Sequence, residues 1–222
     1  MAFTGRQSAP NGLKSPMVYR PTIEEFADFS KFVEKIEVED EAHKAGICKI
    51  IPPKEWVPRK NGYNINDLDI VIEGPIKQKF NLVDRYLKNC YQTTSEAQPK
   101  MSVQDYYKLA TSDEYKLPPR LEGNFNEIER KYWQNIKFKP PIYGCDVSQS
   151  LSDPDLEIWN LGKLDTIMKY VTEDLDTVIQ GVNSPYLYFG MWKATFSWHV
   201  EDMDLYGINM IHYGKINMII KK

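Results

Sequence analysis

Hydrophobic positions near the start of the chain recur with helical spacing and then give way to a short apolar run. In PTIEEFADFSKFVEKIE the apolar side chains fall on one helical face: Phe26, Phe29, Phe32, Val33 and Ile36. Thr22 and Glu25 have the spacing of a capping box, which predicts a helix that begins after Thr22. The run 47–51 that follows is apolar and ends at a double proline, so it predicts a strand.

The middle of the chain predicts short, mixed elements. DLDIVIEGPI predicts a strand that ends at Gly74 and Pro75, whereas the stretch 77–100 is polar and predicts an irregular segment. MSVQDYYKLATSDEY predicts a helix capped by Ser102, and NFNEIERKYWQNI predicts another. DLEIWNLGKLDTIMKYVTEDL predicts a further helix with one packing face, formed by Trp159, Leu164, Ile167, Met168 and Val171.

From Gly181 onward the pattern changes to one typical of strands. GVNSPYLYFGMWKATFSWHVEDMDLYGINMIHYG is rich in aromatic residues and is punctuated by Gly and Pro. The chain therefore runs from helical and mixed to β, which predicts an α+β fold.

Composition narrows the class of protein. With 222 residues the chain is one large domain or two small ones. Its net charge of −3 argues against a nucleic-acid partner, which is bound by neutralising its phosphates with basic side chains. The three cysteines, at positions 48, 90 and 145, form neither a disulfide framework nor a zinc motif. No secretory signal and no run long enough to span a membrane is visible, so we expect an intracellular protein with a disordered lead-in over 1–15.

One short motif carries candidate chemistry. In TFSWHVED, strand alternation places Ser197, His199 and Glu201 on one face, with the last two roughly 7 Å apart along the backbone. An imidazole and a carboxylate at this spacing are two of the three ligands of a two-histidine, one-carboxylate Fe(II) site. On spacing alone, an exposed histidine at a strand end beside a solvated glutamate is the commoner interpretation.

Longer stretches carry a family resemblance. MVYRPTIEEFADFSKFVEKIE with HKAGICKIIPPKEW, then ERKYWQNIKFKPPIYGCDV, then GVNSPYLYFGMWKATFSWHVEDMDLYGIN follow one another in the chain. In this order they resemble the Jumonji histone lysine demethylases, in particular the subfamily that acts on trimethyl-lysine in the histone H3 tail. The resemblance implies a JmjN-like helix and strand unit over 16–58, a mixed linker region over 59–152 and a partial JmjC-like domain over 153–222. That last part is expected to be the first half of a double-stranded β-helix, a jelly-roll barrel of the cupin type.

The resemblance also implies roles for individual residues around a metal. His199 and Glu201 would be the first two iron ligands. Tyr143 would donate its hydroxyl to the distal carboxylate of 2-oxoglutarate, Phe196 would pack against that cosubstrate, and Asn209 would bond near its metal-binding end.

Substrate recognition is implied in the same way. Gly181, Tyr188 and Glu201 would line the methylammonium pocket, and Asp146 and Tyr186 would contact the histone peptide. A trimethylammonium group has no N–H to donate, so an aromatic wall and polarised C–H contacts suit it. The implied reaction uses Fe(II), 2-oxoglutarate and O2 to hydroxylate an N-methyl group, which leaves as formaldehyde. The implied partner is a histone H3 tail with a methylated lysine at position nine or thirty-six, in the nucleus, with no sequence-specific nucleic acid and no membrane.

The sequence departs from the family pattern after the first two ligands. The family takes its distal iron ligand from a histidine on a later strand, and neither His43 nor His212 fits that place. Where the family has a lysine that pairs with 2-oxoglutarate, this chain has Asn217, with Lys215 two residues earlier. The family's Cys and His zinc ligands are also absent from these residues. We therefore expect a truncated chain whose tail after Gly214 is translated intron. The alternative function is a catalytically dead product that acts as a scaffold, a decoy or a histone-binding module.

Overall fold

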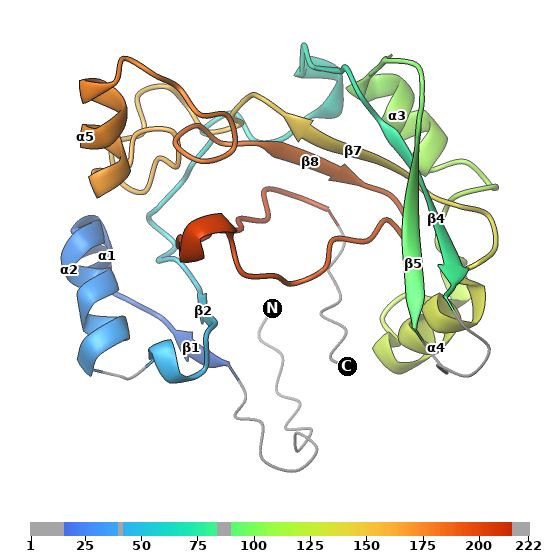
Figure 1. Ribbon diagram of the computed structural model, residues 1–222, viewed down its shortest axis with the longest axis horizontal. Coiled ribbons are helices and arrows are strands. Elements are labelled where there is room, and N and C mark those ends of the chain that lie inside the picture. The colour runs from blue at the N-terminus through green and yellow to red at the C-terminus, as the bar shows by residue number, and fades with distance from the viewer. Residues whose placement is uncertain (1–15, 40–41, 84–89, 215–222) are drawn as a thin grey trace. The chain divides into compact units, whose positions relative to one another are not determined.

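The computed structural model describes residues 16–39, 42–83 and 90–214 of the chain (Figure 1). Two compact units are present, and each is formed by two separate stretches of sequence. The first unit combines residues 1–60 with 152–179, and the second combines residues 61–151 with 180–222. The expected lead-in over 1–15 and the tail after Gly214 lie outside the described residues, so those expectations stay predictions.

The first unit is mostly helical, with one small sheet. Its elements are β1 (Met17–Tyr19), α1 (Ile23–Ala27), α2 (Phe29–Glu34), the π-helix η1 (Lys35–Glu39), the 3-10 helix η2 (Ala42–Lys44), β2 (Cys48–Ile50) and α5 (Ile167–Asp174). Strands β1 and β2 pair in parallel.

The predicted capping box is confirmed, but the helix behind it is not continuous. The Thr22 hydroxyl accepts the Glu25 N–H, and the Glu25 carboxylate accepts the Thr22 N–H. At Asp28 the backbone is extended, so α1 ends there, and the Asp28 carboxylate caps α2 by accepting the Lys31 N–H. Two short helices replace the predicted single one because an aspartate that bonds to nearby backbone N–H groups competes with helix continuation.

An aromatic cluster forms the core of the first unit and corrects a second prediction. Trp159 stacks flat on Phe26, with ring centroids 4.5 Å apart, and its indole N–H donates to the Phe26 carbonyl at 2.7 Å. Trp159 was expected on a helix, yet α5 begins only after Thr166. The expected packing face of that helix is also wrong, since Ile167 and Val171 are exposed. Trp159 lies in a loop, and a positive φ at this residue directs its indole ring into the core. Helical spacing of apolar residues cannot predict such a loop.

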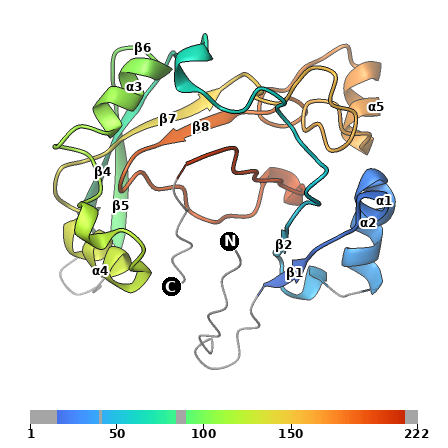
Figure 2. The same ribbon diagram turned by 180° about the vertical axis from the view of Figure 1, so that it is seen from behind.

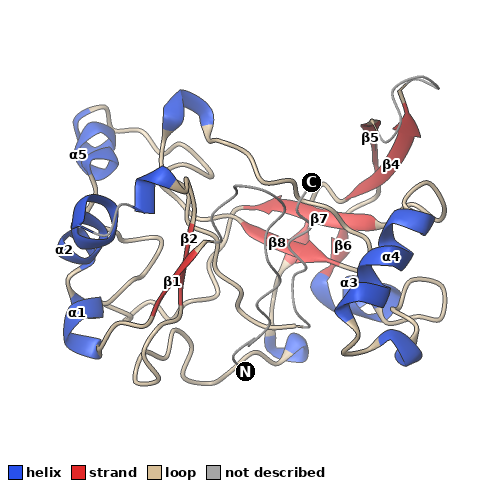
Figure 3. Ribbon diagram, turned by 90° about the horizontal axis from the view of Figure 1, so that it is seen from below, coloured by secondary structure: helices blue, strands red, loops and turns tan. Residues whose placement is uncertain are grey.

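The second unit contains the larger sheet and two capped helices (Figure 3). Its elements are η3 (Ile65–Asp67), β3 (Val71–Ile72), β4 (Ile76–Leu82), β5 (Tyr91–Ala97), β6 (Met101–Ser102), α3 (Val103–Ala110), η4 (Pro119–Leu121), α4 (Phe125–Asn135), β7 (Ile142–Val147), β8 (Leu187–Gly190) and η5 (Asp202–Asp204). Four antiparallel strands lie in the order β5-β4-β7-β8, and β3 pairs with β6. Ser102 caps α3 as predicted, and Asn124 caps α4.

The polar stretch 77–100 is ordered over most of its described length, which corrects the prediction of an irregular segment. Strands β4 and β5 pair residue by residue from Ile76 opposite Ala97 to Leu82 opposite Tyr91. Most β5 side chains are exposed, so the strand lacks the apolar alternation that a sequence pattern requires. Its pairing comes from the backbone, which any residue type except proline supplies.

The two helices of this unit cover opposite faces of the sheet (Figures 1 and 2). On one face, Tyr106 of α3 packs with Ile142 of β7 and Phe189 of β8. On the other, Tyr132 of α4 packs with Phe80 of β4. Strand residues alternate between the two faces of a sheet. The side chains next to Ile142 along β7 and next to Phe189 along β8 therefore point to the same side as α4.

The predicted run of strands after Gly181 is mostly absent from the described residues. Only β8 forms a strand there, and the segment 191–201 has no strand or helix. The prediction that 196–201 is a strand is therefore wrong for this structure. The α+β class is confirmed, since helices and largely antiparallel strands occur together. No helix within the described ranges has the length and apolar character needed to cross a bilayer.

Candidate active site

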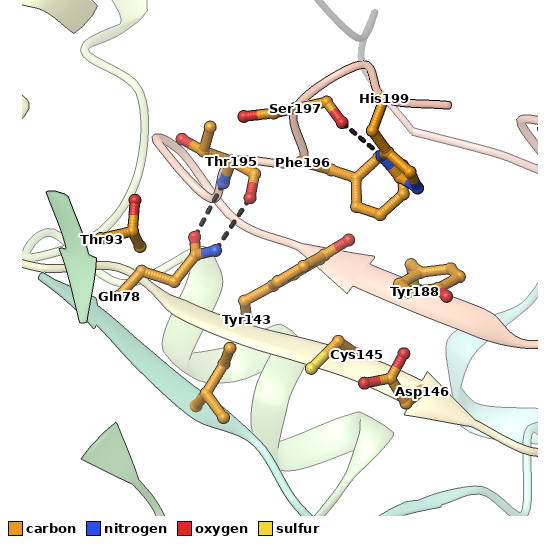
Figure 4. A pocket seen from close by; sticks show the side chains of 11 residues that line it. Gln78, Thr93, Tyr143, Cys145, Asp146, Tyr188, Thr195, Phe196, Ser197 and His199 are labelled. Carbon is orange, nitrogen blue, oxygen red and sulfur yellow. Dashed lines mark hydrogen bonds between the residues drawn. The ribbon is translucent and has the colours of Figure 1, made fainter. Parts of the chain in front are cut away.

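A pocket of about 370 Å³ opens on the face of the sheet opposite α3 (Figure 4). This volume lies in the range of small-molecule sites. Its lining comes from four strands of the sheet and from the segment after β8: Ile76, Gln78, Thr93, Tyr143, Cys145, Asp146, Tyr188, Thr195, Phe196, Ser197 and His199. We call the lining residues from β4, β5, β7 and β8 the sheet wall, and the segment 195–201, of which Thr195, Phe196, Ser197 and His199 line the pocket, the loop wall.

The sheet wall owes its composition to a bulge in β7. The register between β7 and β8 shifts between Gly144 and Val147. Regular alternation would place Asp146 and Cys145 on opposite faces, but the bulge, with Asp146 at φ 56°, lets both line the pocket. Aspartate tolerates this left-handed conformation better than most residues. Gly144 is needed for close packing beneath, because a Cβ there would lie 2.8 Å from Ile72 Cδ1.

The two tyrosine hydroxyls and the cysteine thiol of the sheet wall stay protonated at neutral pH because their pKa values are raised. Burial raises the pKa of the Tyr143 phenol well above its usual range. Burial, with the nearby Asp146 carboxylate, raises the pKa of Tyr188 to about 12 and that of the Cys145 thiol to about 11. The wall therefore presents two phenol O–H donors and an unreactive thiol.

Aromatic rings connect the sheet wall with the loop wall. Tyr143 stacks on Tyr188 with centroids 6.1 Å apart, and Tyr188 meets Phe196 at 5.5 Å. Phe196 in turn meets the His199 ring edge-to-face at 5.0 Å. Tyr186 lies edge-to-face with Tyr188, with their centroids 6.3 Å apart. These contacts bring five of the residues singled out in the sequence into one cluster.

His199 and Glu201 converge although no strand carries them. His199 Nε2 lies 3.5 Å from Glu201 Oε2. The other ring nitrogen, Nδ1, lies 2.8 Å from the Ser197 carbonyl, and because a carbonyl only accepts, Nδ1 carries the proton. The Ser197 carbonyl, and then the Glu201 carboxylate, raise the pKa of His199. In the neutral imidazole, Nε2 therefore presents its lone pair beside a carboxylate.

This donor pair fits a divalent cation. A metal-binding histidine commonly donates its second N–H to a backbone carbonyl, as His199 does here. Glu201 Oε1 has room because residue 207 is glycine, since a Cβ there would lie 2.5 Å from that oxygen. Within 16–39, 42–83 and 90–214, no third His, Cys, Asp or Glu joins the pair to form a metal-binding group.

The structure separates some of the predicted site residues from the pocket. Asn209 is exposed and is not part of the pocket lining. Gly181 is at the surface with φ 80°, where a Cβ would lie 2.5 Å from the Tyr186 ring. Gly181 therefore packs on the Tyr186 ring, and it is the Tyr186 ring that contacts Tyr188. His212 bonds to the Tyr63 hydroxyl at 3.0 Å and does not line the pocket.

Several lining residues were not anticipated from the sequence. Gln78 and Thr93 belong to the stretch that was predicted to be irregular, and Thr195 belongs to the stretch that was predicted to be a strand. One signal for Gln78 exists: in IKQKF it shares the parity of Ile76 and Phe80, so it is a polar residue on an apolar face. Nothing in the sequence indicates that Thr195 would meet it.

Comparison with known proteins identifies two domains. The profile of the jmjN domain matches residues 17–52, and that of the JmjC domain, described as a hydroxylase, matches residues 186–218. The chain is 47% identical over 208 residues to lysine-specific demethylase 4B of Mus musculus, and 45% identical over 207 residues to lysine-specific demethylase 4D of Rattus norvegicus. It is 43% identical over 208 residues to probable lysine-specific demethylase 4F of Homo sapiens. Each match covers 93–94% of this chain but only 18%, 39% and 31% of the respective relative.

These matches define the class of protein. Both domains occur in one chain and in the same order as the sequence resemblance implied. The chain belongs to the Jumonji family of proteins that combine a JmjN with a JmjC domain, in the lysine-specific demethylase 4 subfamily.

Proposed function

We propose that the pocket belongs to an Fe(II)- and 2-oxoglutarate-dependent dioxygenase that demethylates trimethyl-lysine on the histone H3 tail, at lysine nine or lysine thirty-six. The observation that carries the proposal is the convergence of His199 Nε2 and Glu201 Oε2 at 3.5 Å beside a pocket lined by tyrosines. The names of the relatives, which are lysine-specific demethylases, support it. The proposed setting is the nucleus, where the enzyme would regulate chromatin. The four-stranded sheet would belong to a double-stranded β-helix.

His199 and Glu201 would hold the metal. The Ser197 carbonyl fixes the imidazole as the Nδ1–H tautomer, which leaves the Nε2 lone pair available to a cation. The Glu201 carboxylate supplies the negative charge that a divalent ion requires. A bound Fe(II) would activate O2, the oxidant, with 2-oxoglutarate giving up two electrons as it loses CO2, so that one oxygen atom of O2 is available to hydroxylate an N-methyl carbon.

The tyrosines would bind the organic ligands. Because its pKa is raised by burial, Tyr143 remains a phenol and can donate its O–H to a carboxylate of 2-oxoglutarate. Phe196, which contacts both Tyr188 and His199, would pack against the cosubstrate's carbon chain. Tyr188 is partly exposed at the pocket, so its ring can face a methylammonium group, with the Asp146 carboxylate adding an attractive charge.

A second candidate is a histone-binding module without turnover. It is favoured by the donor set, because His199 and Glu201 supply two ligands and no third joins them in the part of the chain that the structure describes, whereas this class of iron site uses three. Recognition of a methylated peptide needs only the aromatic and acidic side chains of the sheet wall, whereas oxidation also needs the metal. Binding and turnover can therefore be tested separately.

The test uses the 222-residue polypeptide with Co(II) as a spectroscopic substitute for Fe(II). We expect His199→Ala to weaken Co(II) binding at least 10-fold. Losing a residue that merely orients a metal ligand already costs about 10- to 100-fold in affinity, and losing the ligand itself should cost no less. The matched control is His212→Ala, which removes a histidine that bonds to Tyr63 away from the pocket. Equal Co(II) affinities for wild type and His199→Ala would refute the proposed metal site.

A peptide arm then separates the two candidates. H3 peptides trimethylated at lysine nine or thirty-six, and the unmodified peptide, are titrated against wild type and Tyr188→Ala. Formaldehyde release with Fe(II) and 2-oxoglutarate is measured in parallel, and we expect none from these 222 residues. Methyl-dependent binding without formaldehyde supports the binding module for this polypeptide, whereas turnover supports the enzyme. Absence of any preference for methylated peptide would contradict both.

A further inference from the structure

Gln78 is a buried polar side chain that joins the two walls of the pocket. It lies on β4 with only 6% of its surface exposed. Its Nε2 donates to the Thr195 carbonyl at 2.8 Å, and its Oε1 accepts the Thr195 N–H at 2.8 Å (Figure 4). The carboxamide therefore pairs with the backbone of residue 195 as a neighbouring strand would.

Gln78 also connects to the strand that carries Tyr143. Its own backbone N–H donates to the Pro141 carbonyl at 3.0 Å, two residues before Tyr143. In the same ladder Ile76 lies opposite Tyr143. Gln78 thus bonds through its main chain to the residues that lead into β7 and through its side chain to Thr195 of the loop wall.

Two further contacts hold the start of the loop wall. The Thr195 hydroxyl donates to the Lys193 carbonyl at 2.8 Å, so the Tyr132 hydroxyl, also 2.8 Å away, must be the donor in the other bond. The Lys193 ammonium donates to the carbonyls of Asn135, Phe138 and Lys139 near the end of α4. Residues 193–195 are consequently attached to α4 and to β4.

The residues that follow have no comparable support. Segment 196–200 pairs with no strand among the described residues. Beyond Thr195, His199 is contacted by the Phe196 ring, by the Ser197 carbonyl and by the Glu201 carboxylate, all within two or three residues of it in the chain, and Phe196 in turn contacts Tyr188. The position of His199 therefore depends on where Thr195 is held, four residues earlier.

We infer that Gln78 is a positioning residue that sets the distance between the His199 side of the pocket and Tyr143. A carboxamide donates to the carbonyl and accepts from the N–H in this geometry, and an apolar residue of equal size can do neither. The metal-binding consequence rests on the proposed function, whereas the structural consequence does not.

The structural consequence is tested by NMR on the metal-free chain. Gln78→Met keeps the volume but removes both bonds to Thr195. We expect the nuclear Overhauser contact between the Phe196 and Tyr188 rings to weaken and amide exchange at Thr195 to speed up. The contact between the Tyr143 and Tyr188 rings should persist, since both belong to paired strands. If Gln78→Met does not fold, Gln78→Asn, which keeps an amide but is one methylene shorter, is measured instead.

Gln104→Met is the matched control. Gln104 is partly buried and donates from Nε2 to the carbonyls of Ile65 and Leu68, at 3.0 Å and 2.7 Å, away from the pocket. It should leave both ring contacts and the amide exchange at Thr195 unchanged. An intact contact between Phe196 and Tyr188 in the Gln78 variant, or its equal loss in both variants, would show that Gln78 has only a general structural role.

The metal-binding consequence is tested by Co(II) titration of the same proteins. We expect Gln78→Met to weaken Co(II) binding about 10- to 100-fold, as the loss of a residue supporting a ligand does. Gln104→Met should change it by less than about twofold. Equal affinities in the two variants would overturn this part. If wild type and His199→Ala bind Co(II) alike, the proposed metal site fails, and the NMR result still decides whether Gln78 positions the loop wall.

Discussion

The two walls of the pocket are built in different ways. On the sheet wall, Tyr143 is 8% exposed and belongs to a strand hydrogen-bonded on both sides, with a packed core beneath. On the loop wall, Phe196 is 47% exposed and its segment has no strand partner in the described part of the chain. The groups suited to recognising organic ligands are thus fixed by the core, whereas the candidate metal ligands depend on a few point contacts.

The largest expected difference compares one phenylalanine from each wall region. Phe189 of β8 is 8% exposed in the core beneath the sheet wall, so Phe189→Ala should lower the free energy of unfolding by about 3–5 kcal/mol. Phe196→Ala removes a half-exposed ring and should cost far less. Urea denaturation of both variants measures the difference. Similar losses for the two would mean that the loop wall is as firmly packed as the sheet.

The next prediction concerns the thiol on the sheet wall. The pKa of Cys145, raised to about 11 by burial and then by Asp146, lies about two units above the reference value of 9.0. Since only the thiolate reacts, alkylation at pH 8 should be about 100-fold slower than for an unperturbed thiol. Its rate should keep rising with pH beyond 9, as followed by peptide mass spectrometry with iodoacetamide.

The control for this prediction is Asp146→Asn. Because burial is the first cause of the raised pKa, removing the carboxylate should speed alkylation only partly. A rate for Cys145 that levels off near pH 9 in the wild type would contradict the prediction.

The same contrast explains what the sequence could and could not predict. Local signals were reliable: Thr22 with Glu25, and Ser102, cap helices as expected because each cap involves residues only three apart. The strand 47–51 was likewise found as β2. Apolar spacing was less reliable, since Trp159 is buried by a loop and not by a helix.

For the site, the residues that converge were recognised from family resemblance, and the contacts that hold them were not. Tyr143, Tyr188, Phe196 and His199 meet in one pocket, although 56 positions separate Tyr143 from His199. The bond between Gln78 and Thr195 joins residues 117 positions apart, and polar residues carry no periodic signal for such pairing. The bulge that turns Asp146 into the pocket is equally invisible in the sequence.

A smaller effect is expected from the residue that bonds to both β7 and β8. The Tyr106 hydroxyl of α3 lies 2.8 Å from the Ile142 carbonyl of β7 and 2.6 Å from the Phe189 carbonyl of β8. Tyr106→Phe leaves both buried acceptors without this donor and should cost about 2 kcal/mol of stability. Tyr107→Phe, on the exposed side of the same helix, is the control and should be neutral. Equal stability of the two variants would show that the hydroxyl contributes nothing to the sheet wall.

The smallest predicted effect concerns the protonation of His199 in the metal-free chain. Its pKa is raised first by the Ser197 carbonyl, which accepts the Nδ1 proton, and then by the Glu201 carboxylate. A raised folded-state pKa stabilises the fold below the unfolded value of about 6.5, and this contribution is lost as pH rises through the folded-state pKa. Protons therefore compete with a metal at Nε2 at low pH, and Co(II) affinity should increase as pH rises.

The two causes can be separated because only one is an interaction between exposed charges. Glu201→Gln should lower the His199 pKa, measured from imidazole 15N shifts, but leave it above its usual value because the Ser197 carbonyl is unchanged. Added salt should lower the wild-type pKa by screening Glu201 and should have a smaller effect on the variant, in which Asp202 is the remaining carboxylate that raises the His199 pKa. A Glu201→Gln variant whose His199 pKa equals that of wild type would mean that the carboxylate does not face the imidazole in solution. The loop wall would then not hold its two candidate ligands together without a metal, which is the sharpest form of the contrast with the sheet wall.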